Sequence, residues 1–171
     1  DDFCFGRDRA GNFDMLKAAG KKYGFEVVNT NSFCVREHRV SSTSIRKALA
    51  DDNIASAEMY LGRAYSINGR VSHGQKLGRT IGFPTANIPL KRCVSPVSGV
   101  YVVQVHGLGG TPVGGVANIG QRPTVNGTRQ QLEVHLFDFD ENLYGKQLEV
   151  SLLKKLRDEQ RFESFEALKK Q

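Results

Sequence analysis

The spacing of apolar residues predicts helices in the first third of the chain. Over residues 13–23 apolar side chains recur at helical intervals, and Gly24 follows as a residue that ends helices. The apolar run FEVV at 25–28 predicts a strand, so this part is expected to form a helix-then-strand unit of an α/β sheet. A second helical pattern over 41–61 starts after Ser and Thr and predicts two helices joined near residues 51–52.

The pattern changes beyond Gly62, where apolar residues alternate or form short β-rich runs. Twelve of the eighteen glycines fall within residues 69–127. The candidate strands, separated by Gly, Pro and Asn turns as in a small barrel or sandwich, are AYSINGRV, GVYVVQVH, GGVANIG, QLEVHLFDF and QLEVSLLKKL. The final ESFEALKKQ predicts a closing helix. We therefore expect two domains, residues 1–62 and 63–171, with the boundary near Arg63.

Composition is that of a soluble globular protein, with 39% hydrophobic and 25% charged residues. No apolar run approaches the roughly 18 residues of a membrane helix, and the N-terminal DDFCFGRDRAG is unlike a secretory signal. The cysteines are odd in number and form no C-x-x-C pair; they are Cys4, Cys34 and Cys93. These features predict reduced thiols, a cytoplasmic location and no membrane partner.

Positive charge is concentrated in the second domain. Residues 1–62 hold nine Lys and Arg against nine Asp and Glu, whereas residues 63–171 hold fifteen against nine. The excess indicates a phosphate-bearing small molecule or a nucleic acid as ligand, or simply a solubilising surface. The alternative from another functional class is a basic β-barrel that binds RNA. It is disfavoured because the aromatic residues lie mostly in strand or core-like positions and not as exposed stacking pairs.

Glycines and basic residues alternate in GRVSHGQKLGRTIGFPTAN, residues 69–87. Glycines let backbone N–H groups approach a ligand closely and the basic side chains add positive charge, so the stretch could cradle phosphates although P-loop spacing is absent. A surface turn is the simpler alternative. Pro84 favours an extended segment in which Thr85 and Asn87 point to the same side. Their oxygens suit Mg2+ when phosphates supply the negative charge, although bonds within a turn would also explain them.

Three further sets of residues could carry chemistry. In QLEVHLFDF, Glu133 and His135 face the same side of a strand, and either could serve as a general base or simply face solvent. In VANIGQRPTVNG, Asn118 and Arg122 are expected in a loop after a strand, where they could hold a polar or anionic group. At the start of a predicted helix, hydroxyls and a basic residue could bind phosphate or merely cap the helix, and these are Ser41, Ser42, Thr43 and Arg46.

Several ordered blocks resemble the bacterial bifunctional riboflavin kinase/FAD synthetase family. They are GRVSHGQKLGRTIGFPTANIPL, GVYVVQV, GVANIGQRPTV, LEVHLFDFDENLYGKQLEV and LRDEQRFESFEAL, which together cover essentially all of residues 63–171. The resemblance implies a mainly β fold, a six-stranded antiparallel Greek-key barrel with a C-terminal helix, preceded by an α/β remnant of a nucleotidyltransferase domain. It also implies a kinase that transfers the γ-phosphate of ATP to the 5′-hydroxyl of riboflavin, giving FMN and ADP.

The resemblance assigns roles position by position. Thr85 and Asn87 match the pair that contacts Mg2+, and Glu133 matches the catalytic base, which separates it from His135 on resemblance alone. The implied ATP-binding residues are Gly69, Arg70, His73, Gly74, Lys76, Leu77, Gly78, Pro84 and Thr85. The implied flavin-binding residues are Asn118, Arg122, Arg157 and Glu159.

The first 62 residues resemble the last part of the family's FMN adenylyltransferase domain, through DDFCFGRDRAG and VSSTSIR. The match makes Ser41, Ser42, Thr43 and Arg46 ATP contacts of that second activity. The His-containing phosphate motif that begins such a domain is not among these 171 residues. FAD synthesis is therefore expected only from a longer, bifunctional parent chain. The expected partners are riboflavin and ATP, with no nucleic acid, and the sequence does not indicate an oligomeric state.

Overall fold

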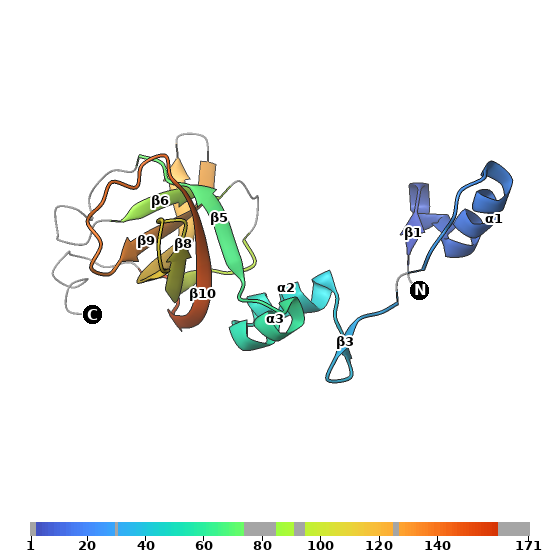
Figure 1. Ribbon diagram of the computed structural model, residues 1–171, viewed down its shortest axis with the longest axis horizontal. Helices are drawn as coiled ribbons and strands as arrows, with labels where there is room; N and C mark the ends of the chain where they lie inside the picture. Colours follow the sequence, from blue (N-terminus) through green and yellow to red (C-terminus); the bar gives the residue numbers. More distant parts are fainter. Residues whose placement is uncertain (1–2, 30, 74–84, 91–94, 125–126, 161–171) are drawn as a thin grey trace. The chain divides into compact units, whose positions relative to one another are not determined.

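A computed structural model describes residues 3–29, 31–73, 85–90, 95–124 and 127–160 of the 171-residue chain (Figure 1). The chain divides into two compact units, Asp1–Arg39 and Val40–Gln171. No helix among the described residues is long and apolar enough to span a membrane.

The described residues of the first unit form one α-helix and two short hairpins. Helix α1, Phe13–Tyr23, has the predicted bounds. Its N-cap Asn12 accepts a hydrogen bond from the Met15 backbone N–H at 3.0 Å, and Gly24 ends it in the left-handed region at φ 77°. The remaining elements are β1 (Cys4–Phe5) with β2 (Gly11–Asn12), the 3-10 turn η1 (Arg7–Arg9), and β3 (Cys34–Val35) with β4 (His38–Arg39).

The strand predicted for FEVV is wrong. Residues 25–28 form no strand pairing, and Phe25 and Val28 are exposed. A β-rich apolar run becomes a strand only beside a partner strand. The two-residue strands described in this unit pair with each other instead.

The second unit begins with the two predicted helices, α2 (Ser42–Ala50) and α3 (Ile54–Leu61). The α2–α3 turn contains Asp51 and Asp52, as expected from the sequence. Leu49 and Ala57 are buried in the same hydrophobic cluster as the sheet that follows. The helix pair and the sheet therefore share one core.

Six antiparallel strands form the predicted barrel, in the order β5-β10-β7-β8-β9-β6. Strands β7, β8 and β9 follow one another and β10 returns beside β7, which is a Greek-key arrangement (Figure 1). Past the end of β5, the Ser72 backbone N–H donates to the Asn87 carbonyl at 2.8 Å and links this edge to β6. The strand bounds are β5 Ser66–Arg70, β6 Ala86–Pro89, β7 Gly99–His106, β8 Val113–Thr124, β9 Gly127–Leu136 and β10 Gln147–Arg157.

The barrel interior is filled by alternate side chains of these strands. On β9, Leu132, Val134 and Leu136 are buried as the alternation predicts, and Glu133 and His135 face the other way. All five candidate strands are present. Strand β6 was not among them, because its four residues fall in a segment dominated by Pro and Gly signals. The predicted closing helix at the C-terminus lies outside the described residues.

Candidate active site

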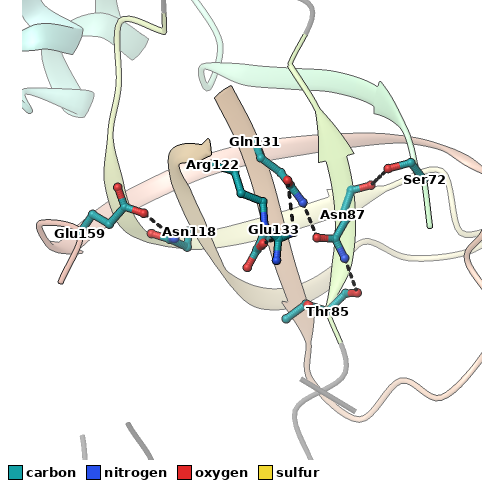
Figure 2. A network of polar contacts seen from close by, with 8 residues as sticks. All are labelled: Ser72, Thr85, Asn87, Asn118, Arg122, Gln131, Glu133 and Glu159. Atoms are coloured by element: carbon teal, nitrogen blue, oxygen red, sulfur yellow. Dashed lines mark hydrogen bonds and ion pairs between the residues drawn. The ribbon is translucent and has the colours of Figure 1, made fainter. Parts of the chain in front are cut away.

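Three neighbouring strands bring the predicted catalytic residues together. In the antiparallel register, Glu133 on β9 lies opposite Asn87 on β6 and opposite Asn118 on β8. Directly paired residues have side chains on the same face of the sheet, roughly 5 Å apart. The outward face of β6, β9 and β8 therefore carries an amide, a carboxylate and a second amide side by side (Figure 2).

Asn87 is held rigidly within this group. Only 7% of its surface is exposed. Its Nδ2 donates to the Thr85 carbonyl at 3.3 Å, and its Oδ1 accepts a hydrogen bond from Gln131 Nε2 (Figure 2). The Thr85 side chain is exposed beside it. The predicted Thr-x-Asn pair is thus ordered through its own backbone and through Gln131.

Glu133 is a half-buried carboxylate with a cationic neighbour. Arg122 Nη1 lies 3.4 Å from Glu133 Oε1 and also donates to Gln131 Oε1 at 3.4 Å. The side chains of Arg122 and Glu133 are 36% and 33% exposed. Gln131 bonds both Asn87 and Arg122, so it connects Asn87 with the ion pair of Arg122 and Glu133. It was not singled out from the sequence, although its position two residues before Glu133 placed it on the same strand face.

Asn118 adjoins the end of β10. Its Nδ2 donates to Glu159 Oε1 at 3.4 Å, whereas its buried Oδ1 has no hydrogen-bond partner among the described residues. The Glu159 carboxylate lies against Gly120, where a Cβ atom would stand 2.0 Å from Glu159 Oε1. A side chain at 120 would therefore displace the Glu159 carboxylate from its position beside Asn118.

Asn118 and Arg122 were expected in a loop, and that expectation is wrong. Both lie within β8, which pairs with β9 from Gly115 to Thr124. The glycines and the proline of this stretch indicated a turn, but regular cross-strand pairing outweighs those local preferences. The strand fixes both side chains relative to Glu133.

Residues predicted to contact Mg2+, to act as the base and to bind flavin line one cavity of about 290 Å³. Its wall includes Thr85, Asn118, Glu133 and Arg157, together with His135. A smaller hollow beside it shares Asn118 and Glu133 and adds Arg122 and Glu159. Because Glu133 and His135 both face the cavity, its geometry leaves either able to act as a base.

The predicted ATP-binding residues are divided between two places. Thr85 lines a further cavity with Tyr144, on whose ring His73 stacks with centroids 4.1 Å apart. Gly69 and Arg70 line another hollow, and Arg70 Nη1 donates to the Gly145 carbonyl at 2.5 Å. The other predicted residues lie outside the described residues, and these are Gly74, Lys76, Leu77, Gly78 and Pro84.

Of the hydroxyl residues at 41–43, Ser41 caps helix α2. Ser41 and Ser44 form a capping box, in which each side chain bonds the other's backbone N–H, at 3.1 and 2.8 Å. Ser42 and Arg46 line a separate hollow with Tyr65 of the second unit. Ser41 thus has a structural role, and Ser42, Thr43 and Arg46 remain on the exposed side of the helix.

A half-buried lysine lies near the end of β10 and was not singled out from the sequence. Lys155 Nζ is 2.6 Å from both Asp52 Oδ2 and Asp158 Oδ1. Burial would lower the Lys155 pKa, but the hydrogen bonds to Asp158 and Asp52 outweigh it and raise the pKa to about 12. The bond from Lys155 lowers the pKa of Asp158. No motif identifies such a residue, because its partners are far from it in sequence.

A sequence model of the family described as "Riboflavin kinase" matches residues 61–171, which is more than half of the chain. The chain belongs to the riboflavin kinase family. A second model, described as "FAD synthetase", matches residues 1–44.

Curated relatives of this riboflavin kinase family member cover its whole length. A bifunctional riboflavin kinase/FMN adenylyltransferase of Escherichia coli K12 is 60% identical over all 171 residues, and the Haemophilus influenzae protein of the same name is 57% identical. The chain spans 55% and 56% of their lengths.

Among solved structures, a crystal structure described as a macrolide-efflux protein from Streptococcus pneumoniae has a TM-score of 0.75 and 34% identity. The similarity covers 99% of this chain and 54% of that one.

Proposed function

We propose that this chain is a riboflavin kinase, which transfers the γ-phosphate of ATP to the 5′-hydroxyl of riboflavin and releases FMN and ADP. The observation that carries the proposal is the single cavity lined by Thr85, Asn118, Glu133 and Arg157. Membership of the riboflavin kinase family supports it.

Glu133 acts as the general base in this proposal. Its carboxylate faces the cavity and accepts the proton of the flavin hydroxyl while that oxygen attacks the γ-phosphorus. The new P–O bond forms as the bond to the ADP oxygen breaks, and ADP carries away the negative charge. Arg122, 3.4 Å from Glu133, helps keep the carboxylate oriented. His135 lines the same cavity and is the alternative base.

The donor set at Thr85 and Asn87 fits Mg2+ that is brought in with the nucleotide. A carbonyl oxygen has two lone pairs, so Asn87 Oδ1 can bind a cation while it accepts from Gln131. A hydroxyl and an amide oxygen supply no negative charge, so phosphate oxygens and water would complete the coordination. When bound, the ion would neutralise charge that develops on the phosphates. Thr85 and Asn87 hold the site in place through the bond from Asn87 Nδ2 to the Thr85 carbonyl.

Flavin is proposed to bind at the end of the cavity formed by β8 and β10. The unpaired Asn118 Oδ1 is a buried acceptor suited to an N–H or O–H group of the ligand. Arg157 lines the same cavity, and Glu159 and Arg122 line the adjoining hollow. Asn118 and Arg122 belong to β8, which neighbours the Glu133 strand β9 on the side opposite β6.

Thr85 lines both the proposed flavin cavity and the cavity that contains Tyr144. ATP is proposed to bind in the cavity that contains Tyr144. The stacked pair of His73 and Tyr144 supplies a flat surface next to this second cavity. Gly69 and Arg70 begin the glycine-rich stretch that is predicted to cradle the phosphates, and they line a hollow of their own. With ATP and flavin on opposite sides of Thr85, the phosphate to be transferred points toward Glu133.

We also propose that the kinase domain starts near Arg63 and that residues 1–62 belong to an FMN adenylyltransferase domain. The FAD synthetase match over 1–44 and the bifunctional relatives support this assignment. The compact unit that contains the barrel nevertheless begins at Val40, because α2 and α3 pack into the barrel core. FAD synthesis is proposed only for a full-length parent.

The test is to incubate the purified chain with riboflavin, ATP and magnesium and to separate the flavins by chromatography. We expect FMN to accumulate with an equimolar amount of ADP and no FAD. A correctly folded chain that forms no FMN at saturating substrates would refute the proposal.

A further inference from the structure

Lys155 connects two parts of the second unit that are about a hundred residues apart in sequence. Its ammonium group bonds Asp52 in the turn between α2 and α3, and Asp158 just beyond the end of β10, both at 2.6 Å. The Lys155 side chain is only 14% exposed. The hydrogen bonds from this ammonium group to the two carboxylates are charge-assisted, and the carboxylate side chains are more exposed, Asp52 at 44% and Asp158 at 88%.

The segment 155–159 departs from regular strand geometry. The pairing of β10 with β7 shifts register between Leu152 and Lys154 and again between Lys155 and Arg157, which marks irregularities of the β-bulge kind. Bulges bend a strand and re-aim its side chains. The residues after Lys155 are therefore turned away from the path of a straight strand.

Two glycines make room for this bent segment. Gly99 lies at φ 109°, and a Cβ atom there would stand 2.6 Å from the Arg157 carbonyl oxygen and 2.9 Å from the Lys155 side chain. Gly120 likewise leaves space for the Glu159 carboxylate, which a Cβ atom at that position would meet. The segment is thus seated against β7 and β8 at two points and anchored by Lys155 at a third.

The far end of the segment 155–159 reaches the proposed flavin cavity. Arg157 lines that cavity, and its Nη1 donates to the Asp158 carbonyl at 3.1 Å. Glu159 follows Asp158 and bonds Asn118. Displacement of Asp158 would consequently move both neighbours, one on each side of it.

We propose that Lys155 is a positioning residue for flavin binding, which holds segment 155–159 against the cavity through its bonds to Asp52 and Asp158. This inference rests on the proposed riboflavin kinase function. Lys155 contacts neither substrate in this scheme. It acts through Arg157 and Glu159, so its loss should weaken riboflavin binding much more than ATP binding.

The test uses substitutions that separate anchoring from folding. Asp52→Asn removes one partner charge, and because Asn accepts the left-handed conformation of residue 52 (φ 58°), it leaves the turn unstrained. Lys155→Met removes the anchor, and Lys155→Arg keeps a cation in its place. Lys154→Met is the matched control, because this exposed neighbour on β10 is outside the proposed anchor.

Steady-state FMN formation gives KM for riboflavin and for ATP, and quenching of riboflavin fluorescence gives the flavin Kd without turnover. We expect Asp52→Asn to raise the riboflavin KM and Kd by about 3- to 10-fold, and Lys155→Met by more, with the ATP KM within about twofold. Lys155→Arg should recover most of the loss, and Lys154→Met should resemble the wild type.

Wild-type-like riboflavin constants in both Asp52→Asn and Lys155→Met would overturn the inference. An equal rise of both KM values in the folded Asp52→Asn variant, judged by its circular dichroism, would also overturn it. A wild-type chain that makes no FMN but still binds riboflavin would instead refute the proposed function, and the Kd series would continue to test the anchor.

Discussion

At the scale of residues, the candidate site is a continuous polar network on the outer face of the barrel. Gln131 bonds both Asn87 and Arg122, and Arg122 in turn lies 3.4 Å from Glu133 (Figure 2). Networks of this kind restrict the rotamers of their members, and phosphoryl transfer depends mainly on such positioning. The hypothesis that Glu133, and not His135, is the general base can be tested by substituting each residue separately.

Glu133→Gln should lower kcat by about 100-fold or more, because an amide cannot accept the hydroxyl proton. The shape of the side chain is kept, so ATP binding should be nearly unchanged. His135→Ala is the matched control on the same strand face and should retain most of the activity. Turnover is followed as FMN formation. Loss of activity in His135→Ala together with full activity in Glu133→Gln would identify His135, and not Glu133, as the base.

Thr85→Ala and Asn87→Ala should each raise the magnesium concentration needed for half-maximal rate, by about tenfold for a lost oxygen ligand. Thr111→Ala, a change of the same kind at an exposed turn position, should leave that concentration unaltered. Rates measured over a magnesium titration at fixed ATP provide the comparison. Identical titration curves for all variants would remove Thr85 and Asn87 from the metal site.

At the scale of elements, the site depends on how β5 and β6 approach each other at the edges of the sheet. A Cβ atom on Gly69 of β5 would stand 2.2 Å from Cγ2 of the fully buried Ile88 on β6. Ile88 is the neighbour of Asn87, so close packing at Gly69 also locates the Thr85–Asn87 pair. The bond from Ser72 to the Asn87 carbonyl reinforces this contact.

Gly69→Ala should therefore destabilise the fold by about 1–3 kcal/mol, the usual cost of inserting a methyl group into a packed interior. Gly110→Ala is the control, because a Cβ there meets nothing within 4 Å. Urea denaturation followed by circular dichroism gives the free energy of unfolding. Equal stabilities of the two variants would mean that β5 and β6 pack less tightly than described.

Most elements could be predicted from the sequence, and the failures have physical reasons. The alternation of Leu132, Val134 and Leu136 identified β9 because one face of the strand is buried and the other is not. The expected strand at 25–28 and the expected loop around Asn118 and Arg122 were wrong, because strand formation is decided by partners that local sequence does not specify.

The candidate site could also be predicted only in part. Motif resemblance indicated Thr85, Asn87 and Glu133, and the register places Asn87 opposite Glu133. Gln131 and Lys155 carry no motif. Their roles arise only from contacts such as that between Lys155 and Asp52, which are 103 residues apart.

At the scale of the molecule, the second unit combines the barrel with a helix pair from outside the proposed kinase domain. Leu49 of α2 and Ala57 of α3 are buried in the barrel's hydrophobic cluster, and Asp52 between them bonds Lys155. Burial raises the pKa of Tyr101, which lies beside this ion pair and donates to the Ser98 carbonyl. The junction is therefore part of the folded core and not a flexible linker.

The Lys155 ion pair should contribute a pH-dependent part of the stability. The folded-state pKa of about 12 lies above the unfolded value of 10.5, so the contribution is complete below pH 10.5 and is lost as the pH rises towards 12. We expect Lys155→Met to be less stable than the wild type by about 1 kcal/mol at pH 8, allowing for screening at the exposed carboxylates. Urea denaturation at several pH values should show this gap narrowing above pH 10.5, with no such trend for Lys154→Met. A gap that stays constant up to pH 12 would contradict the assignment.

The proposed phosphorylation of riboflavin by this barrel can be followed as the transfer of isotope from ATP labelled in its γ-phosphate. We expect the wild-type chain to form labelled FMN, with one phosphate per flavin, in the presence of magnesium, and we expect Glu133→Gln nearly to abolish this labelling. Label that appears only as inorganic phosphate, with riboflavin unchanged, would contradict the proposal.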